Sequence, residues 1–310
     1  MPLLYYDPLF LAHETGDHPE CPARLLPAAR LLHQFTTVFG CERPGWTPIA
    51  RADLELVHTP EYLDFLQRTC EDGGGQLDPD TTVCPRSYEV ALQASGAVAD
   101  AVARVLRGND SQAFCLLRPP GHHALADRAM GFCLLNHVAV GARMALARHG
   151  LERVLIVDWD VHHGNGTQAI FWEDPQVGFF SMHRFPFYPG TGTSDEIGAG
   201  AAAGTKLNLP IEIGTPREAI LDQFETHLQK IAAKMRPELI LLSAGFDAHR
   251  LDPYGSLGLE TDDFGKLTHH LASVAREYCQ GRIVSILEGG YHPMALAESV
   301  DAHLHELMRV

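Results

Sequence analysis

The sequence predicts an α/β fold, with a central parallel sheet and helices on both of its faces. Two observations support this class. Short apolar runs alternate with longer helical patterns along the chain, and the runs are continuous, as in strands buried on both faces. Polar clusters follow the runs, and ligands bind at the carboxyl ends of the strands in parallel sheets. A site is therefore predicted at that edge.

Predicted strands and helices alternate along the chain. Strands are predicted at residues 113–117, 154–158, 177–181, 239–243 and 283–287. Helices are predicted at residues 87–107, 137–149, 216–235 and 261–278. The third helix places Ile220, Phe224, Leu228 and Ile231 at helical spacing. Thr261 is a candidate N-cap for the fourth helix.

Composition indicates a globular protein with a large core. The chain has 310 residues, of which 45% are hydrophobic, and neither a repeat nor a linker-like stretch divides it. We therefore expect a single domain over residues 1–310. No apolar run approaches the length of a membrane span, and the first residues lack a signal-peptide pattern. The seven scattered cysteines include no CxxC pair, so we expect a reduced, cytoplasmic protein.

The charge is strongly acidic. Lys plus Arg number 24 and Asp plus Glu number 39, for a formal net charge of -15. This argues against nucleic-acid binding through a basic face. It favours cationic substrates such as lysine-rich peptides or polyamines. Solubility alone explains the charge equally well.

Two polar blocks contain the candidate metal ligands and acid–base groups. The first reads RPPGHHA at 118–124 and the second DWDVHHGNGT at 158–167. In an extended segment, Asp160 and His162 share one face and can reach one ion. Asp247, which follows another predicted strand, is the best third ligand. Three N/O ligands and an open position suit a hydrolytic zinc site. The alternative is that these are turn or capping residues, which the crowding of the block disfavours.

Two further motifs suggest catalytic groups. His122 and His123 follow a stiff Pro-Pro and a glycine, which suits positioned imidazoles for acid–base work. Tyr291 follows two glycines and can donate a hydrogen bond to an oxyanion, although this signal is weak alone.

These motifs give the chain a resemblance to the histone deacetylase superfamily, which includes acetylpolyamine amidohydrolases. Its motifs lie in family order from end to end: HPECPAR at 18–24, RPPGHHA, DWDVHHGNGT, PGTG at 189–192, SAGFD at 243–247 and EGGY at 288–291. Asn165 and the EGGY motif resemble class II members. The resemblance implies a single arginase/deacetylase-type domain and a zinc-dependent deacetylase acting on acyl-lysine in proteins or peptides.

The resemblance also implies a role for each site residue. Asp160, His162 and Asp247 would bind Zn²⁺, and the same ligands would hold Fe²⁺. His122 and His123 would form the acid–base pair, oriented by Asp158 and Asn165 respectively, with Tyr291 as the oxyanion donor. A structural K⁺ or Na⁺ would use Asp158, Ser181 and the carbonyl groups of Asp160, His162 and Met182. Gly131, Phe132 and Tyr188 would line the substrate channel, Tyr254 would lie at its rim, and Asp80 is either an acceptor for the substrate amide or a plain turn residue.

Three alternatives remain at this stage. The first keeps the enzyme but makes an acetylated polyamine or another small acylated amine the substrate; an acidic residue in place of Tyr254 would have favoured this. The second is a binuclear manganese ureohydrolase, whose extra aspartates are replaced here by Gly164 or Asn165 and by Ala248 or His249. The third is a non-catalytic acyl-lysine binder, which would be expected to lose Tyr291 or a metal ligand. An oligomer is compatible with the sequence, and no membrane or nucleic-acid partner is expected.

Overall fold

The fold is built on a parallel sheet, as predicted. A computed structural model describes residues 1–108 and 110–309. Within these residues the main sheet has seven strands in the order β1-β4-β9-β8-β5-β6-β7, and every neighbouring pair is parallel. The strands are β1 (Leu3–Tyr5), β4 (Gln112–Cys115), β5 (Val154–Asp158), β6 (Val177–Arg184), β7 (Lys206–Ile211), β8 (Leu239–Ala244) and β9 (Ile283–Leu287). A separate antiparallel pair joins β2 (Gly75–Asp78) to β3 (Thr81–Val83).

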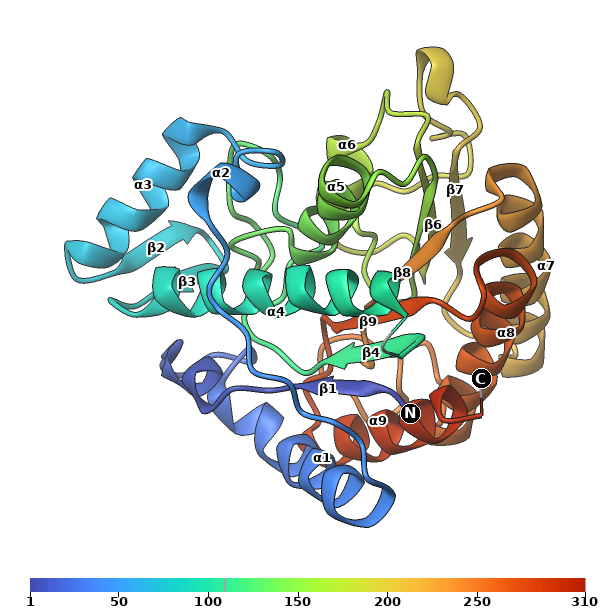
Figure 1. Ribbon diagram of the computed structural model, residues 1–310, viewed down its shortest axis with the longest axis horizontal. Helices are drawn as coiled ribbons and strands as arrows, with labels where there is room; N and C mark the ends of the chain where they lie inside the picture. The colour runs from blue at the N-terminus through green and yellow to red at the C-terminus, as the bar shows by residue number, and fades with distance from the viewer. Residues whose placement is uncertain (109, 310) are drawn as a thin grey trace.

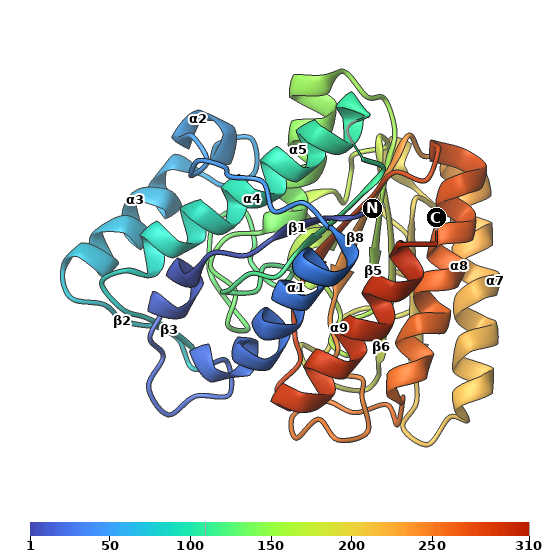
Figure 2. The same cartoon turned by 60° about the horizontal axis from the view of Figure 1, so that its bottom comes forward.

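Helices cover both faces of this sheet (Figure 1). One layer contains α4 (Ser87–Arg107) and α5 (His137–His149), which pack on each other and on the central strands. The other contains α7 (Arg217–Met235), α8 (Thr261–Cys279), α9 (Pro293–Leu307) and α1 (Leu26–Phe39), which lie in a row (Figure 2). Shorter helices are α2 (Arg51–Leu54), α3 (Pro60–Glu71) and α6 (Asn165–Ile170), with 3-10 turns at Pro8–Ala12, Pro22–Leu25 and Gly200–Ala202.

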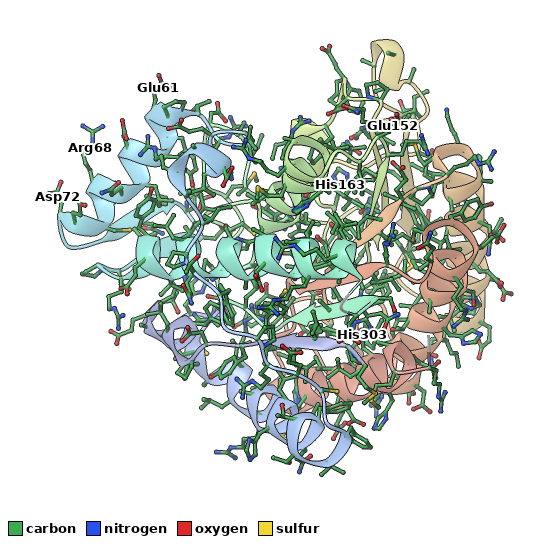
Figure 3. All side chains as sticks on the ribbon, in the orientation of Figure 1. Glu61, Arg68, Asp72, Glu152, His163 and His303 are labelled. Atoms are coloured by element: carbon green, nitrogen blue, oxygen red, sulfur yellow. The ribbon has the colours of Figure 1, made fainter. Side chains whose placement is uncertain are left out.

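Apolar side chains fill the space between the layers, because both faces of the sheet are buried. The central strands β5, β8 and β9 are buried along their whole length. The four apolar residues predicted on one face of α7 are each at most 1% exposed. Figure 3 shows the contrast between His303, which lies inside the fold, and Glu61 and Arg68, which project outward from α3. None of the described helices is long and apolar enough to cross a membrane.

Three predicted boundaries need correction. The strand predicted at 113–117 is β4 and ends at Cys115, because the chain turns into the loop that precedes Arg118. The strand predicted at 177–181 continues to Arg184, so His183 lies inside β6 rather than after it. Thr261 is the first helical residue of α8, while Glu260 is the N-cap and forms a capping box with Asp263.

One buried charge in the sheet is unusual. Lys206 in β7 is 1% exposed, and its Nζ donates hydrogen bonds to the carbonyl oxygens of Asp174 (3.1 Å) and Val177 (2.7 Å) and to Thr205 Oγ1 (2.8 Å). These acceptors are neutral. Burial therefore lowers the pKa of the Lys206 ammonium to about 8.

This pKa gives a testable pH dependence of stability. Above about pH 8 the folded chain releases the Lys206 proton, whereas the unfolded chain keeps it up to about pH 10.5. Since the unfolded state binds more protons in this window, the unfolding free energy of the wild type should rise with pH relative to that of Lys206→Met. Denaturant unfolding of both proteins at the two ends of the window measures this, with exposed Lys230→Met as the control. The same difference at both pH values would contradict the assignment.

Candidate metal and acid–base site

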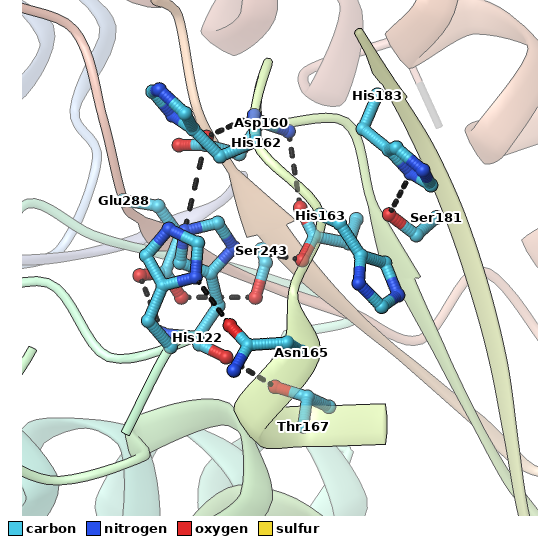
Figure 4. A network of polar contacts seen from close by, with 12 residues as sticks. His122, Asp160, His162, His163, Asn165, Thr167, Ser181, His183, Ser243 and Glu288 are labelled. Atoms are coloured by element: carbon cyan, nitrogen blue, oxygen red, sulfur yellow. Dashed lines mark hydrogen bonds and ion pairs between the residues drawn. The ribbon is translucent and has the colours of Figure 1, made fainter. Parts of the chain in front are cut away.

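Three ionisable side chains meet at the carboxyl-terminal edge of the sheet. Asp160 and His162 follow β5, and Asp247 follows the neighbouring strand β8. Nδ1 of His162 lies 3.0 Å from Oδ1 of Asp160 and 3.2 Å from Oδ2 of Asp247. Ligand atoms of the three residues all lie within 4.8 Å of one another, and Asp160 and His162 are drawn in Figure 4. The structure thus brings together the residues predicted to bind a metal.

Backbone amides orient the two carboxylates of this triad. Asp160 accepts hydrogen bonds from the amide of His162 through Oδ1 (2.9 Å) and from that of Gly289 through Oδ2 (2.8 Å). Oδ1 of Asp247 accepts from the amide of Val161 (2.9 Å). A Cβ atom at Gly289 would lie 2.2 Å from Oδ2 of Asp247, so only glycine permits this close approach.

The donor set fits a divalent cation. Among the described residues, no hydrogen-bond donor is assigned to the buried Oδ2 of Asp247, and Nδ1 of His162 lies 3.2 Å from it. Burial and the neighbouring charge of Asp160 raise the pKa of Asp247 to about 7. A buried carboxylate oxygen with no donor is in surroundings that favour a cation. Two carboxylates and one imidazole are ligands that zinc takes readily, and three ligands leave a position open.

Two histidines with different partners lie beside the triad. The ring centroids of His122 and His123 are 4.0 Å apart. Nδ1 of His122 lies 2.9 Å from Oδ2 of Asp158, and Nδ1 of His123 lies 2.7 Å from Oδ1 of Asn165. Both rings are nearly fully buried. The predicted pairings of Asp158 and Asn165 with these histidines are therefore present as contacts.

These partners separate the charge states of the two rings. Burial opposes protonation of His122, but Asp160 and Asp158 outweigh it and raise the pKa of His122 to about 10. Burial lowers the pKa of His123 well below its usual value, and the charge of His122 lowers it further. Asn165 contributes no charge that would reverse this shift. The arrangement therefore places an imidazolium beside a neutral imidazole.

The GNGT segment after the histidines fits against them because its glycines lack side chains. A Cβ atom at Gly164 would lie 2.2 Å from Oδ2 of Asp158, and one at Gly166 would lie 2.3 Å from the carbonyl oxygen of Ala124. The amide of Thr167 donates to the carbonyl oxygen of His122 (3.1 Å). These contacts hold α6, which begins at Asn165, against the histidine loop.

The residues predicted to bind a monovalent cation also cluster. Asp158 pairs with Ser181 across β5 and β6, and Met182 follows in the buried part of β6. Oγ of Ser181 lies 2.9 Å from Nδ1 of His183, a contact that the sequence did not suggest. Figure 4 shows Ser181 and His183 on this strand. Cation binding by these residues stays a prediction.

A narrow cavity leads to the histidines and the triad. Its volume is about 190 Å³, and its lining contains every residue that was predicted for the channel. The lining residues are Asp80, His123, Gly131, Phe132, His162, Phe187, Tyr188, Tyr254 and Tyr291. Phe187 was not predicted, although it stacks on His162 with ring centroids 5.1 Å apart. Its only signal was its place in the aromatic segment before Tyr188.

Glycine and aspartate shape the wall of this cavity. A Cβ atom at Gly131 would lie 2.5 Å from the His123 ring, and Gly131 has a φ of 58°. Its amide donates to Oδ1 of Asp80 (3.2 Å), which also accepts from Thr81 Oγ1 (3.1 Å). Burial raises the pKa of Asp80. In this structure, the Asp80 carboxylate therefore braces the cavity wall.

Tyr291 and Tyr254 are joined through Asp252, another residue that the sequence did not reveal. Oδ2 of Asp252 accepts from the amide of Tyr291 (2.7 Å), and Oδ1 accepts from the amide of Tyr254 (2.9 Å). The two tyrosine rings meet edge to face at 5.7 Å. Burial, together with Asp247, raises the pKa of Tyr291 well above its usual value, so its hydroxyl stays protonated and able to donate. The site can hold a cation beside an acid–base pair and a phenol donor, as metal-assisted hydrolysis requires.

Comparison with known proteins agrees with this architecture. The chain matches the family model described as the histone deacetylase domain over residues 18–307. It is 41% identical over 315 residues to uncharacterized protein slr0245 of Synechocystis, covering 99% of this chain and 100% of that one. It is 38% identical over 315 residues to human polyamine deacetylase HDAC10, covering 96% of this chain and 46% of that one. The solved HDA15 HD domain is 36% identical, with a TM-score of 0.93 over 99% of this chain and 89% of that one. The chain belongs to the histone deacetylase family.

The triad can be tested through metal content. Asp247→Asn removes the carboxylate whose Oδ2 is buried and unpartnered, so the purified variant should bind zinc far more weakly than the wild type. Elemental analysis after dialysis against limiting zinc measures the stoichiometry. Asp195→Asn, at an exposed carboxylate, is the control. Full zinc occupancy in Asp247→Asn would remove Asp247 from the ligand set.

Proposed function

We propose that this protein is a zinc-dependent amidohydrolase that removes acetyl or other short acyl groups from acyl-lysine in proteins or peptides. One observation carries the proposal: a donor triad of zinc type lies beside two histidines with unlike partners, and one member of each group, His162 and His123, lines the narrow cavity. Membership of the histone deacetylase family supports deacetylation as the reaction.

Asp160, His162 and Asp247 would hold the metal, as zinc or as ferrous iron. Bound there, the ion would supply Lewis acidity toward an amide carbonyl and would lower the pKa of a bound water. The backbone amides that donate to both oxygens of Asp160 and to Oδ1 of Asp247 keep these carboxylates in place. Asp158 and Ser181, with the backbone carbonyl groups of Asp160, His162 and Met182, would bind a structural K⁺ or Na⁺ nearby.

His123 is suited to act as the general base. It is neutral at rest, it lines the cavity, and Asn165 fixes the orientation of its ring. His123 takes a proton from water as the oxygen attacks the acyl carbon. The carbon–nitrogen bond then breaks, and His123 returns the proton to the departing amine. The products are a carboxylate and a free amine.

His122 and Tyr291 stabilise the negative charge that develops during attack. His122 stays cationic between Asp158 and Asp160. Tyr291 keeps its proton and can donate a hydrogen bond to the oxyanion, where such a bond is worth most. Phe132, Tyr188 and Phe187 present aromatic surface to the apolar chain of an acyl-lysine, while Gly131 leaves room for it.

An acylated polyamine is the second candidate substrate. The human relative is named as a polyamine deacetylase, and the net charge of -15 would attract cationic amines. Tyr254 is not a carboxylate, however, and Asp80, the carboxylate in the cavity lining, already accepts hydrogen bonds from the amide of Gly131 and the hydroxyl of Thr81. The acyl-lysine peptide is therefore the preferred substrate class.

Replacing Tyr291 tests the mechanism. Tyr291→Phe removes one oxyanion donor and leaves the ring contacts with Phe132 and Tyr254, so kcat should fall by about 100-fold or more. Zinc content should equal that of the wild type. Tyr6→Phe, a phenol outside the cavity, is the matched control. Wild-type kcat in Tyr291→Phe would exclude this tyrosine from the reaction.

The substrate class can be decided by direct competition. We expect zinc-loaded protein to show a higher kcat/KM for an acetyl-lysine peptide than for an N-acetylated polyamine, because the cavity is aromatic and Tyr254 is uncharged. A preference for the polyamine would contradict the peptide assignment and indicate that the protein is a deacetylase of small acylated amines. If metal-loaded protein hydrolysed neither substrate, deacetylation itself would be contradicted.

A further inference from the structure

Glu288 lies outside the metal triad, yet it contacts the loop that bears both histidines. We propose that Glu288 is a positioning residue, which fixes the His122–His123 loop through hydrogen bonds to its backbone. This role depends on the length of the Glu288 side chain rather than on its charge. The inference rests on the proposed deacetylase function. It adds a residue that affects the reaction indirectly, by holding His122 and His123 in place.

The contacts of Glu288 are specific to the start of the catalytic loop. Oε2 accepts from the amides of Gly121 (2.6 Å) and His122 (3.1 Å), two successive residues. Oε1 accepts from Oγ of Ser243 in β8 (2.9 Å). Glu288 itself directly follows β9 and is fully buried. Figure 4 shows Glu288 between Ser243 and the His122 loop. The carboxylate thus ties the loop to two central strands.

The loop cannot compensate easily for the loss of these bonds. A Cβ atom at Gly121 would lie 2.8 Å from the amide nitrogen of His137, so the loop is already pressed against the start of α5. Nε2 of His137 contacts the carbonyl oxygen of Pro119 (3.1 Å), and Nδ2 of Asn136 donates to that of Ala124 (3.1 Å). These residues hold the two ends of the loop. In the middle, Glu288 accepts from the amides of Gly121 and His122, while the carbonyl oxygen of His122 accepts from the amide of Thr167.

The donors around Glu288 explain why an acceptor is needed there. Two amides and one hydroxyl point at its two oxygens, and an ionised carboxylate only accepts. A glutamine of the same length can still accept from both amides through its carbonyl oxygen, while the Ser243 hydroxyl turns to accept from its NH₂ group. An aspartate keeps the charge but is one methylene too short to reach the amides.

A matched set of variants can therefore separate the effect of side-chain length at position 288 from the effect of charge. Steady-state kinetics of the zinc-loaded full chain compares Glu288→Gln, Glu288→Asp and Glu288→Ala, with zinc content measured for each. Positioning predicts near wild-type kcat in Glu288→Gln and a loss of about 100-fold in the two shortened variants, as small misplacements of reacting groups produce. KM and zinc occupancy at the Asp160–His162–Asp247 triad should change little, since Glu288 belongs neither to the cavity lining nor to that triad but to a separate buried group with His122 and Cys133.

The opposite pattern overturns the proposal. If Glu288→Asp keeps its kcat while Glu288→Gln loses it, the charge of Glu288 matters rather than its reach. Wild-type kcat in all three variants would show that the loop is held without Glu288.

A measurement independent of turnover separates this proposal from the proposed function. Histidine-ring ¹⁵N resonances of His122 and His123 should shift in Glu288→Asp and stay close to wild type in Glu288→Gln. If wild-type protein hydrolyses no acyl amine while these resonances behave as expected, the deacetylase function fails and the positioning role stands. Unshifted resonances in Glu288→Asp would reject the positioning role even in an active enzyme.

Discussion

The site depends on carboxylates that the parallel sheet gathers where they are buried from solvent. Asp158, Asp160, Asp247 and Glu288 are each at most 1% exposed and lie at the ends of adjacent strands. Like charges at short range in a medium of low dielectric repel strongly. The cluster is tolerable only if protons, imidazolium or metal cations offset its charge. Burial and then the charge of Asp160 raise the pKa of Asp247 to about 7, while Asp160 and Asp158 outweigh burial and raise the pKa of His122 to about 10.

Glycines let the strand ends come close enough to build this cluster. Gly245 and Gly289 leave space beside Asp160, where a Cβ atom would lie 2.3 Å and 2.6 Å from Oδ2. The same need explains the glycines on either side of Asn165. A side chain at any of these positions would separate the strands or loops whose polar groups must meet. The glycine-rich motifs are therefore a consequence of the charge cluster and of the ring contacts beside it.

Much of this could be predicted from the sequence because the signals were local. The strands β5, β8 and β9 are continuous apolar runs, and the motif residues directly follow such runs. The edge strands β1 and β7 escaped prediction for physical reasons. β1 has three residues, and β7 contains Lys206 and a proline, which do not resemble a buried strand. The ammonium of Lys206 is accommodated there by carbonyl oxygens contributed from another segment.

The supporting residues were harder to predict, because their partners are distant in the chain. Glu288 accepts a hydrogen bond from the amide of Gly121, which is 167 positions away in the chain. Asp252 accepts one from the amide of Tyr291, which is 39 positions away. Neither pairing leaves a periodic or adjacent pattern in the sequence. Phe187 contacts His162 across a loop, and its role in the cavity follows only from that packing. A sequence motif thus identifies groups that can react, whereas the residues that hold these groups in place become apparent only in the folded structure.

The two adjacent histidines differ in the partner that each ring contacts and in the direction in which its pKa is shifted. Both rings are buried, and each has its Nδ1 within 2.9 Å of a side-chain oxygen. The partner of His122 carries a charge and the partner of His123 does not. Because burial penalises the charged form of both rings, only the ring with carboxylate neighbours can afford a proton. The cation on His122 then opposes a second proton on His123. Asp160 and Asp158 thus outweigh burial at His122, whereas burial and the neighbouring cationic rings keep His123 neutral.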